Sequence, residues 1–527
     1  MGEAATRLPG VRFEVRPPAT QVSPLRTDIA GFIGPTWRGP VNEAARVEGW
    51  RAYQELFGEL THGADTAYAV RGYFENGGEV AYVVRLLGGP EIHAEGLWKV
   101  GEVDAVNDRW EPSAPGSAGF RAAVFRVVAT TPGNWANDLK VRFRYRRRGP
   151  QGRAEVDIEV RPARGAPESL PGLPAADLAE EVAKRSRLIR LVVAQPAPPS
   201  AASPGPLAKV WDAVALAGGV EAPPGRDDYD AGARLLAETR EVALMAAPDL
   251  HVMPGGETAR DDMIALMAAL AEEKHDRQVV AETPPGRSNV PAVLAWLGEL
   301  RAGLDEAFPR SLAFYHPRLA VPDPLGGLVA PLREISPVGH VAGVISRLDR
   351  ERGAHHTPAN AEIYQAVDLA RRYGAEEQGA LAMGGINPLL CAPGNGLVIW
   401  GGRTAHNPAL GSGGLFLAHR RLIHRLIRAI RRVAEPLVFE VNGPDLWLIL
   451  ARAITSVLLE AWHAGALKGD MPEQAFRVRC DESTNPRESE DAGEVLCEVL
   501  LAPAAPMEFI ALRIAITREG RLEAIEA

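Results

Sequence analysis

Histidine and cysteine are the side chains of this sequence whose chemistry could support a metal site or a nucleophile. His355 and His356 are adjacent, and adjacent histidines rarely bind one ion; no histidine pair four residues apart accompanies them or His340. An acidic pair follows Cys480, and acidic neighbours disfavour the thiolate that a nucleophilic cysteine needs. The sequence therefore predicts no metal site and no catalytic cysteine.

Glycine-rich turns could instead bind phosphate. A dinucleotide site requires G-x-G-x-x-G between a strand and a helix, so that backbone N–H groups reach the phosphates. Residues 248–251 read Pro-Asp-Leu-His, residues 283–286 read Thr-Pro-Pro-Gly, and the glycine run 411–414 follows no suitable strand. The sequence also lacks a G-x-S-x-G elbow. We predict no catalytic residue and no cofactor, and we keep a nucleotide-binding α/β enzyme only as an alternative.

The charge balance bears on nucleic-acid binding. The chain has 58 Lys and Arg against 67 Asp and Glu, which gives a formal net charge of −9 and disfavours a nucleic-acid partner. Five arginines lie between residues 142 and 148, but those of 139–147 alternate with apolar residues. The chain then turns at 149–152 and returns as a second alternating run. This pattern predicts a β-hairpin with a solvated basic face rather than a nucleic-acid patch.

A second group of arginines belongs to an amphipathic helix, expected over 419–433 within the periodic run 415–434. The four arginines follow one another at steps of four, three and four residues, which places them on one helix face: Arg421, Arg425, Arg428 and Arg432. From the pattern alone, this face either binds a partner or is a solvated face that pairs with acids of its own domain.

Both ends of the chain contain an isolated alternating strand. Residues 9–16 alternate apolar and charged side chains and precede two prolines, and residues 508–516 have period two close to the end of the sequence. A lone strand is unstable in water and must pair with a sheet. Either each strand folds back onto its own domain or it adds to another subunit. The apolar residues concerned are Val11, Phe13, Val15, Ile510, Leu512 and Ile514.

Between the ends, elements of three kinds are expected. Residues 31–86 predict a small unit of strands and helices. Helices over 231–240, 258–273 and 291–304 alternate with apolar strands, which predicts a parallel βαβ arrangement. The stretch 194–206 has the composition of a linker.

Three further features bear on the cellular compartment. The first ten residues contain no apolar stretch of a secretory signal, and no run approaches the roughly 18 apolar residues that span a bilayer. The three cysteines, Cys391, Cys480 and Cys497, lack metal-like spacing, so we expect reduced thiols packed as small core residues. We therefore expect synthesis in the cytoplasm and no direct membrane insertion.

Short motifs along nearly the whole chain resemble those of the contractile tail sheath proteins. The opening residues 9–14 are similar to that family's N-terminal arm. Further blocks follow in the family's order: GFIGPTWRGPVNE (31–43), WRAYQELFG (50–58), VRGYFENGG (70–78), PGNWAN (132–137), GHVAG (339–343), RLDRERG (347–353), PAN (358–360), WGGRT (400–404) and CDESTNP (480–486). Between residues 89 and 204 only the block at 132–137 matches.

The resemblance implies a multidomain α/β and α+β protein with an inner α/β core built from the N- and C-terminal regions. The expected divisions are an N-terminal linker arm (1–25), the first part of the inner core (26–88), a β-rich inserted outer domain (89–204), an α/β middle domain (205–335), the second part of the inner core (336–505) and a C-terminal linker arm (506–527).

The resemblance also implies a mechanical function without catalysis. Sheath subunits polymerise as stacked rings into a helical sleeve around an inner tube, and the sleeve contracts to drive the tube through a target envelope. The implied partners are further copies of the chain, the tube protein, and baseplate and cap or terminator proteins. The terminal strands would exchange between subunits, and the basic helix would contact the tube. The particle would assemble in the cytoplasm and leave the cell by lysis. A non-contractile scaffold or baseplate component of the same particle is the alternative.

Overall fold

The computed structural model of this chain describes residues 26–100, 102–104, 109–111, 123–147, 154–174, 177–193, 212–394, 396–410, 414–437, 440–488, 494–504, 512–516 and 522–526. These residues divide into two compact units. The larger unit comprises residues 26–424 with the described part of 504–527, and the smaller unit comprises residues 425–503. The boundary falls within helix α9 (Leu417–Ala434).

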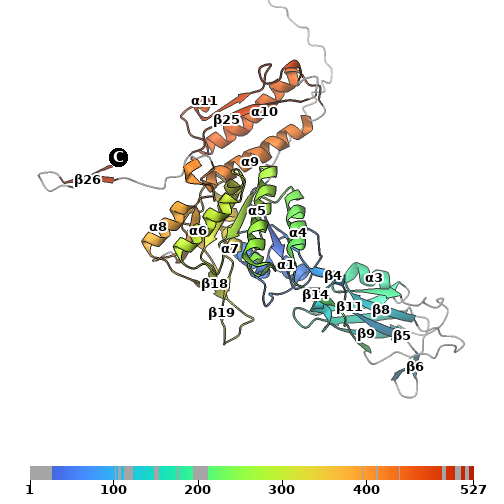
Figure 1. The fold of residues 1–527 in the computed structure, drawn as a ribbon. Coiled ribbons are helices and arrows are strands. Elements are labelled where there is room, and N and C mark those ends of the chain that lie inside the picture. Colours follow the sequence, from blue (N-terminus) through green and yellow to red (C-terminus); the bar gives the residue numbers. More distant parts are fainter. Residues whose placement is uncertain are drawn as a thin grey trace, which may run out of the picture. The chain divides into compact units, whose positions relative to one another are not determined.

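A nine-stranded sheet forms the centre of the larger unit (Figure 1). Six neighbouring strands, from β3 to β22, run parallel, and the strands at both edges pair antiparallel. In spatial order the strands are β2 (Ala45–Val47), β3 (Ala81–Arg85), β1 (Ala30–Gly34), β15 (Leu244–Ala246), β16 (Gln278–Glu282), β17 (Leu312–His316), β22 (Ile386–Ala392), β23 (Gly396–Ile399) and β20 (Glu362–Ile363). The predicted parallel βαβ arrangement is confirmed.

Helices cover both faces of this sheet. Phe32 and its neighbour Ile33 point into opposite cores because side chains alternate along a strand. The core around Phe32 is built with α1, α2 and α7, and the core around Ile33 with α4, α5, α6 and α8. The helices are α1 (Trp50–Phe57), α2 (Thr66–Glu75), α4 (Arg226–Glu238), α5 (Gly256–Lys274), α6 (Val290–Ala302), α7 (Val338–Glu351) and α8 (Ala375–Gly384).

The GHVAG motif lies where α7 crosses α2 at short range. A Cβ atom on Gly339 would lie 2.0 Å from the carbonyl oxygen of Ala69, and one on Gly343 would lie 2.4 Å from that of Tyr73. Only glycine fits at these positions, because any side chain would push the two helices apart. The motif therefore specifies a helix crossing.

A β-rich body is inserted between β3 and α4. The hairpin predicted over 139–161 is confirmed, with Arg142 opposite Glu159 and Arg144 opposite Asp157. Its strands and helix are β4 (Gly88–Ile92), β5 (Glu95–Val100), β6 (Glu102–Asp104), β7 (Arg109–Glu111), β8 (Ala123–Ala129), β9 (Lys140–Arg147), β10 (Ala154–Arg161), β11 (Glu168–Pro174), α3 (Leu178–Arg185), β12 (Ile189–Val193), β13 (Asp212–Ala215) and β14 (Val220–Ala222). The insertion continues past the expected boundary at residue 204, because β13 pairs with β9 and β14 pairs with β4.

Three short strands form a separate sheet in the larger unit. β18 (Leu319–Pro322) pairs antiparallel with β19 (Leu332–Ile335) on one side and with β21 (Asp368–Leu369) on the other. The loop between β18 and β19 projects away from the rest of the larger unit (Figure 1).

The smaller unit combines helices with a two-stranded antiparallel sheet. The second half of α9 is followed by α10 (Pro444–His463), α11 (Pro472–Ala475), β24 (Phe476–Arg479) and β25 (Glu498–Leu501). A disulfide joins Cys480, next to β24, to Cys497, next to β25. The expectation of reduced thiols is therefore wrong for these two residues, because strand pairing brings together cysteines that are 17 positions apart. Cys391 is a free, exposed cysteine.

The division into an inner core and a middle domain differs from the structure. One continuous sheet contains strands from 26–88, from 205–335 and from 336–505. Since β1 pairs directly with β3 and β15, no boundary separates the segment 26–88 from the segment 205–335.

Candidate functional site

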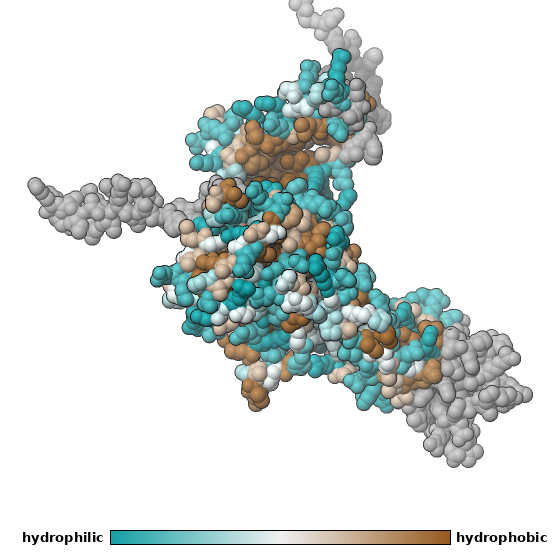
Figure 2. All heavy atoms as spheres, viewed as in Figure 1, coloured by the Kyte–Doolittle hydropathy of each residue, from teal (hydrophilic) through white to brown (hydrophobic). Residues whose placement is uncertain are grey.

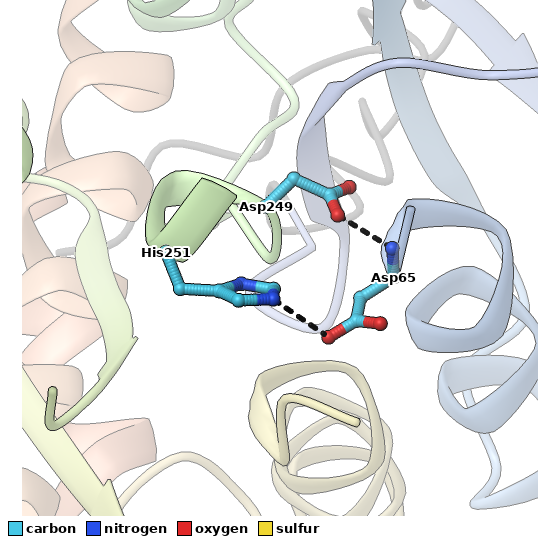
Figure 3. A group of neighbouring side chains, drawn as sticks. All are labelled: Asp65, Asp249 and His251. Atoms are coloured by element: carbon cyan, nitrogen blue, oxygen red, sulfur yellow. Dashed lines mark hydrogen bonds and ion pairs between the residues drawn. The ribbon is translucent and has the colours of Figure 1, made fainter. Parts of the chain in front are cut away.

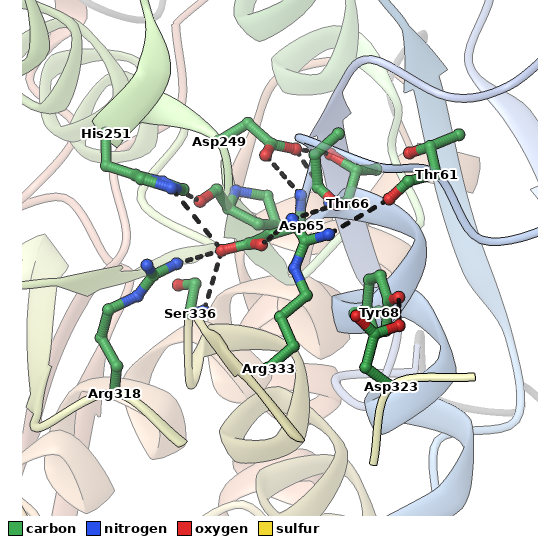
Figure 4. Close-up of polar contacts among 12 residues, drawn as sticks. Thr61, Asp65, Thr66, Tyr68, Asp249, His251, Arg318, Asp323, Arg333 and Ser336 are labelled. Carbon is green, nitrogen blue, oxygen red and sulfur yellow. Dashed lines mark hydrogen bonds and ion pairs between the residues drawn. The ribbon is translucent and has the colours of Figure 1, made fainter. Parts of the chain in front are cut away.

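A buried ionic cluster lies at the carboxyl ends of the parallel strands, where open α/β sheets commonly bind ligands (Figure 4). Asp249 follows β15, Glu282 ends β16, and Arg318 follows β17. Asp65 precedes α2, and Arg333 lies on β19. This cluster is therefore the first candidate site for chemistry.

The Asp249 carboxylate accepts hydrogen bonds at the start of α2. Its donors are the backbone N–H groups of Asp65 and Thr66 and the Thr66 hydroxyl. Burial, and after it the charge of Asp65, raise the pKa of Asp249 to about 6. Asp249 thus satisfies backbone N–H groups that a helix N-terminus leaves without intrahelical partners.

The Asp65 carboxylate is also fully engaged. It accepts hydrogen bonds from the guanidinium groups of Arg318 and Arg333 and from the backbone N–H of Ser336. These contacts tie the start of α2 to the segment after β17, to β19 and to the residues before α7 (Figure 4).

Three of these residues have the composition of a metal site. Potential ligand atoms of Asp65, Asp249 and His251 lie within 4.8 Å of one another (Figure 3). The oxygens of both carboxylates, however, already accept hydrogen bonds, and Arg318 and Arg333 supply the positive charge that a metal ion would bring. The arrangement therefore fits a network of internal ion pairs that holds these elements together, rather than a metal centre.

Glu282 completes the cluster and is 8% exposed. Its carboxylate lies 3.2 Å from Nε of Arg318 and 3.6 Å from Nδ1 of His251. Burial raises the pKa of Glu282 to about 7, so this group takes up a proton near neutral pH.

The structure separates the arginines of the basic helix into two pairs. Arg421 is 2% exposed, bonds to Asp349 on α7 and donates to the carbonyl oxygen of Thr27 at 2.8 Å. Arg428 is 1% exposed. The four arginines therefore do not form one exposed face, and Arg421 is buried with its charge paired to Asp349. Arg425 and Arg432 are partly exposed.

The predicted arm residues are only partly within the described chain. Val11, Phe13, Val15 and Ile510 lie outside the described residues. Leu512 and Ile514 lie on β26 (Leu512–Ile516), which pairs antiparallel with β27 (Leu522–Glu526). Their exchange between subunits stays a prediction.

The smaller unit offers a surface on which such strands could be added. Within the described residues, β24 and β25 pair only with each other, so neither has a second strand as a partner. On α10, Leu446, Trp447 and Leu458 are buried, whereas Leu448 and Ile449 are each 49% exposed. Figure 2 shows apolar side chains gathered on the smaller unit. This unit therefore presents both strand edges and apolar surface.

Among the described residues, α10 alone is long and apolar enough to cross a membrane by length and composition. The sequence predicts no such run. The finding is weak evidence for a membrane span, because the core helix of a soluble protein passes the same test, and α10 packs against β24.

Sequence reasoning missed Arg85, which joins two of the sequence motifs. This fully buried side chain donates to the carbonyl oxygens of Gly39 at 2.8 Å and Pro132 at 3.0 Å, so it links the 31–43 block to the 132–137 block of the insertion. Trp37 and Trp135, one from each block, also meet, with ring centroids 6.5 Å apart. The available signal was an arginine at the end of an otherwise apolar strand.

Two stretches of the chain match domains of one protein family. Residues 224–405 match the phage tail sheath protein central domain, and residues 415–517 match the phage tail sheath C-terminal domain. Together these matches span more than half of the chain.

A tail sheath protein of Vibrio phage KVP40 is 29% identical over 186 residues, which are 34% of this chain and 26% of that protein. The chain thus matches about a quarter of that relative's length. The fold resembles the helical sheath of the anti-feeding prophage in its contracted state, with TM-score 0.57, 20% identity and coverage of 97% of this chain and 99% of that chain. It also resembles a sheath tail protein of Listeria innocua, with TM-score 0.59, 12% identity and coverage of 90% and 94%.

The two family domains follow each other in this chain as a central and a C-terminal domain, and the fold is that of solved sheath proteins. The ionic cluster fits a structural network of ion pairs, in agreement with a family of structural proteins rather than of enzymes. This chain belongs to the phage tail sheath proteins.

Proposed function

We propose that this chain is the subunit of a contractile sheath. Copies would polymerise into a helical sleeve around an inner tube, and contraction of the sleeve would drive the tube through a target envelope. The observation that carries this proposal is the match of both the central and the C-terminal part of the chain to sheath domains. The sleeve would be assembled in the cytoplasm with baseplate and cap proteins at its ends and released by lysis.

The terminal strands would join the subunits. A strand that adds to β24 or β25 forms main-chain hydrogen bonds along an open edge, and its alternate side chains can pack on apolar surface. The half-exposed Leu448 and Ile449 of α10 supply such surface in the same unit. Val11, Phe13 and Val15 at one end of the chain and Ile510, Leu512 and Ile514 at the other would be the inserted residues.

Polymerisation of the purified protein tests the proposal. We expect long hollow tubes by negative-stain electron microscopy, because a contact between two different surfaces that does not close generates an open helix. Deletion of residues 1–18 should abolish the tubes and leave the thermal unfolding of the subunit unchanged. Persistent monomers of the intact chain at high concentration would contradict the proposal.

The partly exposed arginines of α9, Arg425 and Arg432, would contact acidic side chains of the tube. Pairs of this kind are individually weak and sensitive to salt, so they could break when the sleeve contracts. Arg421 has an internal role instead, because its guanidinium group pairs with Asp349 inside the larger unit.

A further inference from the structure

The loop between β18 and β19 presents two apolar side chains to solvent. Leu328 is 101% exposed and Val329 is 98% exposed, relative to the reference exposure of each residue type. We call Leu328 and Val329 the apolar tip. Figure 2 shows apolar side chains at the end of the projecting loop.

Hydrogen bonds hold the loop in one conformation. The N–H of Asp323 donates to the carbonyl oxygen of Pro331 at 2.8 Å, and the N–H of Ala330 donates to that of Gly326 at 3.1 Å. The Asp323 carboxylate accepts from the hydroxyl of the buried Tyr68 at 2.6 Å and from the N–H of Leu325 at 2.9 Å. The apolar tip is therefore presented by an ordered turn that is anchored to α2.

Glycine is required in this turn. A Cβ atom on Gly326 would lie 1.8 Å from the carbonyl oxygen of Ala330, and Gly327 has φ +57°. Single exposed apolar residues are common on protein surfaces and do not require a tightly constrained turn. Here a glycine-dependent turn holds two aliphatic side chains together in solvent, which is what a contact surface requires.

We propose that the apolar tip packs against a neighbouring copy of this chain in the assembled sleeve. This inference rests on the proposed function, since it requires a polymer of identical subunits. In a helical polymer whose subunits all point the same way, a projection on one subunit meets a different surface on the next, which is the heterologous type of contact that generates a helix.

Charge argues against a lipid surface as the partner. Loops that insert into anionic membranes are usually flanked by available basic residues. Here Asp323 lies at the base of the loop, and the nearby Arg333 bonds to Asp65 and lies over the ring of Tyr68, 4.8 Å from its centroid.

The small area of the apolar tip indicates that the partner is held in place by other contacts. A stable interface between two proteins buries about 1,200–2,000 Å² in total, which two aliphatic side chains cannot provide. In a homopolymer the same small contact recurs at every subunit and adds to the contacts made elsewhere. A second copy already positioned in the polymer is therefore the partner that this surface fits.

The test compares Leu328→Ser/Val329→Ser with Leu328→Met/Val329→Ile, which keeps the tip apolar. Both variants should unfold at the wild-type temperature, because neither side chain is buried. We expect the serine variant to raise the protein concentration needed for half-maximal tube assembly at least tenfold, and the Met/Ile variant to assemble like the wild type. Equal assembly of all three proteins would overturn the inference while the proposed function stands.

Photo-crosslinking identifies the partner directly. Benzoylphenylalanine in place of Leu328, irradiated in sheath assembled on its tube, should yield a covalent dimer of sheath chains. An adduct with the tube protein, or no adduct, would overturn the inference. Failure of the wild-type protein to form any tubes would instead reject the proposed function itself, and the inference with it.

Discussion

At the scale of single residues, the charged cluster beside the nine-stranded sheet is buried and fits a structural role. Asp65, Asp249, Glu282, Arg318 and Arg333 lie together at the edge of the sheet where an enzyme would place its substrate. Their contacts are made to one another and to the start of α2. Removing one charge leaves its partner buried and uncompensated, which typically destabilises a protein by about 3–5 kcal/mol.

We predict a pH-dependent contribution from Glu282. Its pKa in the folded chain is about 7, against an ordinary value of 4.5. The folded state therefore binds the proton more tightly than the unfolded state, and this contribution to stability grows as pH falls through 7 and is complete below 4.5. Relative to Glu282→Gln, which mimics the protonated form, the wild type should gain up to about 3 kcal/mol over that range.

Urea unfolding of both proteins at several pH values measures this difference. The comparison with the glutamine variant cancels the contributions of titrating groups that do not contact Glu282, such as the buried His340. A free-energy difference that is constant from pH 8 to pH 4.5 would show that Glu282 does not carry the raised pKa.

At the scale of elements, α9 begins in the larger unit and ends in the smaller one. Its first turns are fixed in the larger unit by buried arginines, of which Arg420 lies 3.5 Å from Glu272 and Arg421 bonds to Asp349. Its later turns, beyond the boundary between the units, carry the partly exposed Arg425 and Arg432. The helical spacing of the arginines is the same throughout, so only the packing separates the buried Arg421 and Arg428 from the partly exposed Arg425 and Arg432.

We predict that Arg425→Glu/Arg432→Glu weakens binding of the sheath to its tube. Each exposed ion pair contributes about 0.2–1 kcal/mol, so the effect becomes large only because it recurs in every subunit. Co-sedimentation with tube at increasing salt should show strong salt dependence for the wild type and little for the variant. Arg51→Glu/Arg164→Glu changes the net charge equally at exposed positions in the larger unit and should behave like the wild type. Normal tube binding by the α9 variant would exclude the contact.

The sequence was informative about elements with strong periodicity. The βαβ helices, the parallel strands and the hairpin at 139–161 follow from spacing alone, and the structure confirms them. The order of strands in the sheet could not be predicted, because β1 pairs with strands that begin 51 and 214 residues further along the chain. The burial of Arg421 and the pairing of Cys480 with Cys497 escaped prediction for a related reason: each depends on a partner brought close only by the fold.

At the scale of the whole molecule, the chain consists of two units with different means of stabilisation. Among the described residues, the larger unit has three apolar cores, one on each face of its nine-stranded sheet and one in the inserted β-rich body. The smaller unit has fewer buried side chains and contains the Cys480–Cys497 disulfide. Small units with limited cores often depend on such cross-links.

We predict that Cys480→Ala/Cys497→Ala destabilises the smaller unit by about 3 kcal/mol, the loss expected for a disulfide that closes a loop of this length. Scanning calorimetry should show a lower temperature for one unfolding transition and an unchanged temperature for the other. Cys391→Ala, which removes the exposed free thiol, serves as the control. A uniform decrease of both transitions would contradict independent unfolding of the two units.

The nine-stranded sheet is built from segments far apart in the sequence, and this determines when, during synthesis, the protein can fold. The first strand, at Ala30–Gly34, must wait for β15 and then for β22 and β23, the last of which ends at Ile399. Synthesis proceeds at about 5–20 residues per second, so most of the polypeptide is made before all strands of that sheet are available to pair. The C-terminal strands leave the ribosome later still. A nascent chain would therefore lack the proposed C-terminal joining segment until its core can form, and we expect this order of synthesis to disfavour polymerisation on the polysome.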